Sequence, residues 1–131
     1  MATSTVIGID PGTCITGYGI VKYVDNKYIP IGFGCIRPPK KLPLSKRYLI
    51  IFQSIKELIK KFLPTSLAVE TQFVKKNPQS ALKLGMARAS ILLAAEICNI
   101  EIYEYAPKQA KLAVVGNGAA TKQQVQKMIQ M

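Results

Sequence analysis

Short apolar runs alternate along the chain with longer segments in which apolar residues recur every three or four positions, and this pattern predicts an α/β order. Over 44–62 the apolar residues lie on one helical face, and Pro64 ends that predicted helix. Five runs have the length and residue types of strands: 5–10, 17–23, 28–36, 66–70 and 100–105. The first three of them predict an antiparallel meander.

Capping residues predict three further helices. Asn77-Pro78 is a strong helix start, because asparagine caps the first turn and proline fits its first position, and this helix is expected to run to Asn99. Pro107 opens a shorter predicted helix, and Thr121 with Gln124 forms a capping-box pattern for the last one. The order of elements therefore indicates a mixed sheet covered by helices.

Two of the predicted strands end in a carboxylate, Asp10 and Glu70. The 44–62 helix is long enough to return strand 66–70 parallel to strand 5–10, so both carboxylates would emerge at the same edge of the sheet. In open α/β sheets, ligands bind at that edge. Pro11 and Gly12 continue the chain as a turn, in which Pro11 fixes φ and Gly12 tolerates a positive φ.

A carboxylate at the end of a buried strand can bind a metal, hold a phosphate through a metal, or cap a turn. Burying Asp10 and Glu70 is costly unless they are paired or coordinated, and neither has a basic neighbour in its own strand. Hard carboxylate oxygens suit Mg²⁺ or Mn²⁺. Two such ions ~4 Å apart can clamp the attacking and leaving oxygens of a phosphodiester displacement. The alternative is that Asp10 only stabilises its turn and Glu70 faces solvent.

The composition narrows the class of partner. The chain has 131 residues, which is enough for a single domain over 1–131, and 49% of them are hydrophobic. Eighteen Lys and Arg stand against seven Asp and Glu, and a net charge of +11 favours a polyanionic partner such as nucleic acid. The sequence contains no histidine, which excludes Ser-His triads and histidine-based zinc sites.

The cysteines and the hydropathy bear on location. Cys14, Cys35 and Cys98 are far apart and odd in number, which is typical of reduced thiols in a cytoplasmic protein. No apolar run approaches the ~18 residues that a membrane span needs, so no contact with a membrane is expected.

Basic and aromatic residues near the predicted carboxylate pair are candidates for nucleic-acid contacts. Phe73 shares the loop after Glu70 with Lys75 and Lys76, and aromatic rings stack on unpaired bases while lysines neutralise phosphates. Phe73 could equally fold into the core. Three more lysines flank a glycine-rich turn that resembles a helix-hairpin-helix, with solvated side chains as the alternative: Lys108, Lys111 and Lys122.

Small residues recur every four positions on the helix that begins at Pro78. Ala81, Gly85 and Ala89 form a stripe that lets another helix or a sheet approach closely. Packing on the chain's own sheet and contact with a second copy of the chain both explain it.

Several of these segments together resemble the RuvC-type Holliday junction resolvases, and the resemblance covers essentially the whole chain. They are GIDPG at 8–12, TGYG at 16–19, GCIR at 34–37, Val69-Glu70 with Phe73, NPQSALKLGMARA at 77–89, and EYAPKQAKLAVVGNGAATKQQVQKMI at 104–129. The resemblance implies a ribonuclease H-like α/β fold with a mixed five-stranded sheet and helices on both faces. It also implies a homodimer that nicks four-way DNA junctions symmetrically with Mg²⁺ in recombination and repair, beside a branch-migration complex. Asp10 and Glu70 match metal ligands of the family, Phe73 matches the aromatic at the opened junction, and Lys111 and Lys122 match DNA-contacting positions.

The chain departs from the family pattern in one respect. The family completes its metal site with an acidic pair on a later helix, and no carboxylate follows Glu104 here. Glu101 and Glu104 lie on a predicted strand and do not match that pair. We therefore expect that the C-terminal part of the family domain is missing and that this chain cleaves poorly or not at all, with a non-catalytic junction-binding protein as the alternative function. GIDPGT also resembles the first phosphate loop of actin-like ATPases and sugar kinases, which need a second, related domain.

Overall fold

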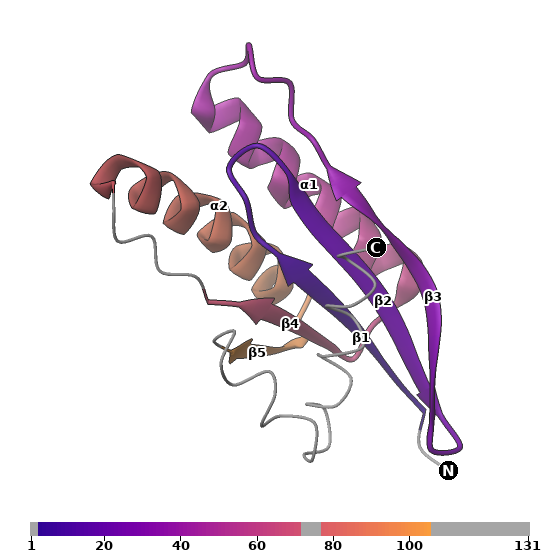
Figure 1. Cartoon of the computed structure of the whole chain (residues 1–131). Coiled ribbons are helices and arrows are strands. Elements are labelled where there is room, and N and C mark those ends of the chain that lie inside the picture. Colours follow the sequence, from indigo (N-terminus) through magenta and orange to yellow (C-terminus); the bar gives the residue numbers. More distant parts are fainter. Residues whose placement is uncertain (1–2, 72–76, 106–131) are drawn as a thin grey trace.

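The computed structural model describes residues 3–71 and 77–105, which form five strands and two helices (Figure 1). In chain order these elements are β1 (Ser4–Asp10), β2 (Thr16–Val24), β3 (Lys27–Ile36), α1 (Leu44–Phe62), β4 (Ser66–Glu70), α2 (Pro78–Ile97) and β5 (Glu101–Tyr105). All seven elements were predicted from the sequence pattern.

The five strands form one mixed sheet in the order β3-β2-β1-β4-β5. The first three strands pair antiparallel as a meander, and β4 and β5 extend the sheet in parallel with β1. Helix α1 is the crossover that returns the chain from the edge strand β3 to β4, on the far side of β1. The mixed five-stranded sheet predicted from the sequence is therefore confirmed.

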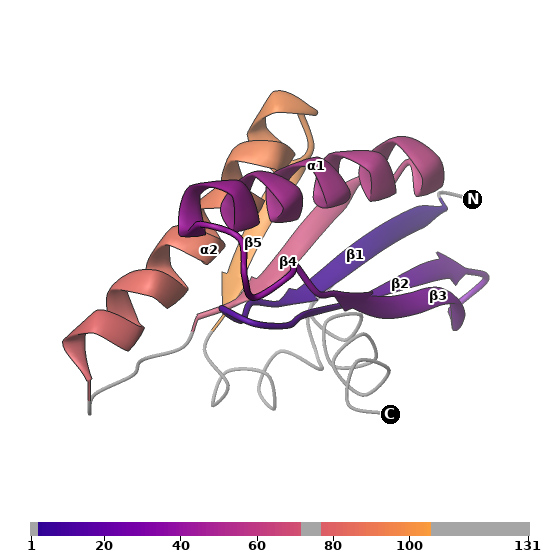
Figure 2. The ribbon, with the colours of Figure 1, turned by 90° about the horizontal axis from the view of Figure 1, so that it is seen from above.

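Both described helices cover the same face of the sheet, as Figure 2 shows from above. On this face Ile7, Ile9, Leu67 and Val69 of the central strands pack in one buried cluster with residues of both helices. Helix α1 contributes Ile51, Ile55 and Ile59, and α2 contributes Ala87, Ile91, Ala94 and Ala95. The buried residues of the 19-residue helix α1 recur every three or four positions, so they lie on the side of the helix that faces the sheet.

The ends of the helices follow local chemistry. The Asn77 side chain accepts hydrogen bonds from the backbone N–H groups of Gln79 and Ser80, as the Asn-Pro pair predicted. Helix α2 ends at Ile97 rather than at Asn99, because Asn99 takes a left-handed conformation with φ of 61° that stops the helix. Asparagine tolerates this conformation better than most residues.

The other face of the sheet carries a separate small cluster of Val6, Ala68 and Tyr105. The helices predicted from Pro107 onward lie outside the described residues, so a helical cover on this second face stays a prediction. Neither described helix is long and apolar enough to cross a membrane.

The core position of α1 can be tested by truncation. We expect Ile55→Ala to lower the free energy of unfolding by about 2–5 kcal/mol, because the side chain is fully buried and its loss leaves a cavity. Leu49→Ala on the exposed side of the same helix is the matched control and should cost less than about 1 kcal/mol. Urea unfolding measures both, and equal losses would contradict the packing described here.

Candidate metal centre

Asp10 and Glu70 are the last residues of two neighbouring parallel strands. The register pairs Ile7 with Leu67 and Ile9 with Val69, which brings the two carboxylate-bearing residues next to each other. Adjacent strands lie ~4.8 Å apart, and residues at matching positions project from the same face. Since Ile9 and Val69 face the helices, Asp10 and Glu70 lie on the opposite face of the sheet.

The strand register brings a third side chain, Tyr105, close to the two carboxylates. Glu70 is 6% exposed, Asp10 is half-buried, and Tyr105 pairs with Glu70 across β4 and β5. Burial, followed by the negative charges of Glu70 and Asp10, raises the pKa of the Tyr105 phenol far above its ordinary value. The phenol therefore stays protonated at any working pH and adds no third negative charge to the pair.

The loop after Asp10 is closed by a buried threonine. Thr16 is fully buried, its hydroxyl donates to the Gly12 carbonyl at 3.2 Å, and it accepts from the Gly12 N–H at 3.4 Å. A Cβ on Gly12 would lie 2.0 Å from the Ile15 carbonyl oxygen, so only glycine fits. The prediction that Gly12 serves by taking a positive φ was wrong, because no described glycine has one; close backbone approach is the reason.

Helix α1 also contacts this loop. The Arg47 guanidinium, in the first turn of α1, donates a 2.6 Å hydrogen bond to the Thr13 carbonyl. The two residues are 34 positions apart in the chain, and no sequence pattern signalled the contact. The loop that follows Asp10 is thus tied both to itself and to the start of α1.

Asp10 and Glu70 fit a hard divalent cation as part of its ligand set. Both offer carboxylate oxygens, the donors that Mg²⁺ and Mn²⁺ prefer. Within residues 3–71 and 77–105, no group of three or more His, Cys, Asp or Glu side chains gathers to hold a metal. Asp10 and Glu70 are therefore the metal-ligand candidates that the described residues contribute to the site.

The two acidic residues of β5 have other partners. Glu104 forms an ion pair with Arg88 of α2, and Glu101 accepts a hydrogen bond of 2.5 Å from the Tyr103 hydroxyl. These contacts agree with the prediction that Glu101 and Glu104 do not belong to the metal site.

Helix α2 presents the stripe of small residues mostly outward. Gly85 and Ala89 are exposed, a Cβ on Gly85 would meet nothing within 4 Å, and Ala81 is half-buried. Packing of Gly85 and Ala89 on the chain's own sheet is therefore excluded, since the inward side of α2 consists of other residues.

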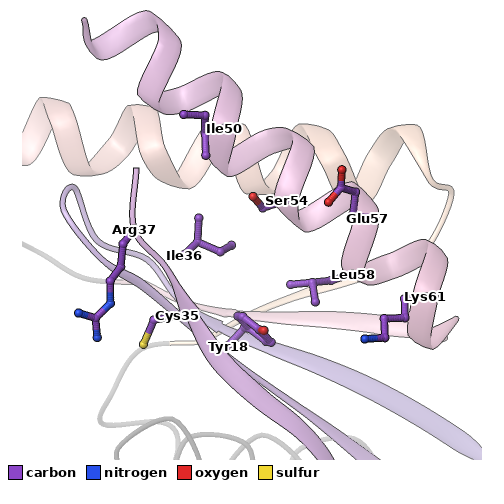
Figure 3. A pocket seen from close by; sticks show the side chains of 9 residues that line it. All are labelled: Tyr18, Cys35, Ile36, Arg37, Ile50, Ser54, Glu57, Leu58 and Lys61. Carbon is purple, nitrogen blue, oxygen red and sulfur yellow. The ribbon is translucent and has the colours of Figure 1, made fainter. Parts of the chain in front are cut away.

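The predicted DNA contacts lie outside the described residues and stay predictions: Phe73, Lys75, Lys76, Lys108, Lys111 and Lys122. A pocket of about 450 Å³ lies between α1 and strands β2 and β3, on the face that carries the helices (Figure 3). Arg37 and Lys61 lie at its two ends (Figure 3). Neither Asp10 nor Glu70 lines this pocket, so it is not the metal centre.

Known proteins are similar to this chain in sequence and in fold. The family described as Crossover junction endodeoxyribonuclease RuvC matches residues 6–131. A relative of that name from Protochlamydia amoebophila is 54% identical over 125 residues, which are 95% of this chain and 74% of the relative. Another from Chlamydia muridarum is 48% identical over 126 residues, with 95% and 74% of the two chains covered.

The solved structures agree with the sequence match. The structure of Thermus thermophilus RuvC in complex with Holliday junction substrate matches with a TM-score of 0.76 at 29% identity, covering 86% of this chain and 71% of that one. The mixed sheet is thus the ribonuclease H-like fold that the resemblance implied. By sequence and by fold, the chain belongs to the RuvC family of crossover junction endodeoxyribonucleases.

Proposed function

We propose that this chain binds four-way DNA junctions and resolves them by paired phosphodiester cleavage in recombination and repair. The observation that carries the proposal is the parallel register of β1 and β4, which ends two neighbouring strands in Asp10 and Glu70 on one face. Membership of the family supports the reaction class, and the T. thermophilus relative was solved with a Holliday junction substrate. The net charge of +11 suits a nucleic-acid substrate and disfavours a sugar kinase.

Asp10 and Glu70 are the residues that would hold the metal in this proposal. We expect Mg²⁺, for which Mn²⁺ can substitute, with two ions per subunit. Bound Mg²⁺ supplies stabilisation of the charge that develops on the phosphodiester oxygens and lowers the pKa of a bound water.

The chain's own side chains define where that chemistry takes place. The buried Glu70 carboxylate has little room to change its orientation, and the neutral Tyr105 phenol leaves the charge of the site to the two carboxylates. Thr16 and Gly12 fix the turn that follows Asp10. In this proposal the strands and the turn place the two carboxylates before any DNA binds, as preorganised catalysis requires.

DNA recognition rests on the residues that sequence patterns identified beyond Glu70. In this proposal Phe73 stacks on an unpaired base at the opened junction, and Lys75 and Lys76 neutralise nearby phosphates. Lys108, Lys111 and Lys122 contact the DNA backbone.

A homodimer is part of the proposal, because a four-way junction has two equivalent strands to cut. The outward side of α2 supports it: Leu82 is 66% exposed, Leu93 is 57% exposed and Ile97 is 60% exposed, beside the small residues Gly85 and Ala89. A helix that is apolar on both sides is typical of one buried between two layers. A second copy of this chain, related by a twofold axis, would cover that side.

The cellular setting is inferred from chemistry and family. All three cysteines are free thiols, which supports a reducing cytoplasmic location. A junction resolvase acts on DNA that other enzymes move, so we include a branch-migration complex among the partners.

The central carboxylate can be tested with a labelled synthetic four-way junction. We expect Asp10→Asn to reduce any Mg²⁺-dependent nicking by at least about a hundredfold, because a cation ligand is lost, while junction affinity stays the same or rises. The matched control is Asp25→Asn, the same change in the exposed turn between β2 and β3. Nicking that survives Asp10→Asn unchanged would contradict the proposal, because cleavage would then not depend on this carboxylate. Junction binding with no nicking by the unaltered chain would favour a role in binding alone.

The dimer surface can be tested at Gly85, where an added Cβ would meet no atom of the described residues within 4 Å. Gly85→Gln should raise the stability of the monomer by up to about 1 kcal/mol through helix propensity, because the position is exposed and an added Cβ is not crowded there. In a dimer the same side chain enters the interface, so the dissociation constant should rise at least about tenfold. Sedimentation equilibrium compares it with Lys83→Gln, an exposed control on the same helix. Equal dissociation constants would place the interface elsewhere.

A further inference from the structure

The connection between β3 and α1 carries a concentration of positive charge that the metal centre does not use. From Asn26 to Lys56 the sequence contains no Asp or Glu. Five cations lie within an eleven-residue stretch of it, which we call the basic connection: Arg37, Lys40, Lys41, Lys46 and Arg47. No ion pair joins these side chains to a carboxylate in the described part of the chain.

The basic connection lies against the loop that follows Asp10. Arg47 donates to the Thr13 carbonyl at 2.6 Å. The pKa of the exposed Cys14 thiol is lowered by hydrogen bonds from Thr13 and Arg47, and also by the positive charges of Lys40 and Arg47. Both cations are therefore close enough to act on a residue four positions after the proposed metal ligand.

The start of α1 adds to this positive field. The helix begins at Leu44 after Pro43, with no side-chain cap and no acidic residue in its first turn. Lys46 and Arg47 occupy that turn, where the helix dipole disfavours cations. Such an arrangement is unfavourable in isolation and becomes favourable when an anion lies beside it.

We propose that the basic connection binds the sugar–phosphate backbone of a duplex arm of the junction, next to the strand that enters the metal centre. This rests on the proposed function, and it adds a contact surface separate from the lysines predicted beyond Glu70. Duplex DNA is the occupant because it is the polyanion that the proposed metal centre would act on, and the cations of a protein surface neutralise its backbone phosphates.

The cations of this surface have different tasks. Arg47 holds the loop after Asp10 through its hydrogen bond to Thr13, so its removal would also disturb the metal centre. Lys40 and Lys41 are exposed, and no described hydrogen bond involves their side chains. They are therefore the positions at which loss of DNA contact can be separated from loss of structure.

The test compares two double variants of the 131-residue chain that remove the same charge. Lys40→Gln with Lys41→Gln lies in the basic connection. Lys27→Gln with Lys60→Gln is the control, because Lys27 begins β3 opposite the start of β1 and Lys60 is in the last turn of α1, both at the end of the sheet away from Asp10. Affinity for a synthetic four-way junction and for a linear duplex is measured between 50 and 200 mM salt, without divalent cations.

The slope of log K against log salt is negative, and each lost phosphate contact lowers its magnitude by ~0.9. We expect the Lys40/Lys41 variant to lose about two from that slope and roughly tenfold in affinity on both DNAs, while the control keeps the original slope. The same slope for both variants would overturn the inference. Failure of the unaltered chain to bind the junction would instead overturn the proposed function, and urea unfolding of each variant confirms that it is folded.

Discussion

The parallel pairing of β1 with β4 holds two negative charges together, and the rest of the site is organised around that constraint. Two like unit charges ~5 Å apart repel each other by about 3 kcal/mol at an effective dielectric constant of ~20, and carboxylates at the ends of adjacent strands are subject to such repulsion. The buried cluster of Ile7, Ile9, Leu67 and Val69 on the opposite face keeps the two strands in register in spite of this repulsion. A divalent cation bound between two carboxylates would convert such repulsion into attraction, which supports the proposal of a metal centre at this pair.

The constraint also explains what surrounds the pair. Tyr105 remains neutral, because ionisation would place a third negative charge in a buried position beside Glu70 and Asp10. On the other side of the loop that follows Asp10, the Arg47 guanidinium donates to the Thr13 carbonyl. Hence one face of the sheet edge offers acceptors for a cation, while the neighbouring basic connection offers donors for a phosphate, and a phosphodiester near the edge would meet both.

Local patterns were sufficient to predict the elements and the carboxylate pair. The amphipathic spacing of α1, the Asn77 cap and the crossover between β3 and β4 determine where Asp10 and Glu70 meet. Long-range contacts left no such signal: Arg47 is 34 positions from Thr13, and Tyr105 joins the site only through the register of β5. Periodicity could not predict which side of α2 faces the sheet, because apolar residues lie all around this helix. The expectation of a positive φ at Gly12 failed because the nearby Ile15 carbonyl, and not the backbone conformation, excludes a side chain there.

The central claim, that Asp10 and Glu70 hold a divalent cation, can be tested without any DNA. Mn²⁺ binding to the unaltered chain, to Glu70→Gln and to the control Glu57→Gln on the exposed side of α1 can be followed by the electron paramagnetic resonance of free Mn²⁺. The account predicts saturable binding to the unaltered chain and to the control, and binding at least about tenfold weaker to Glu70→Gln. Equal binding to all three would contradict it, because the pair on β1 and β4 would then not be the metal centre.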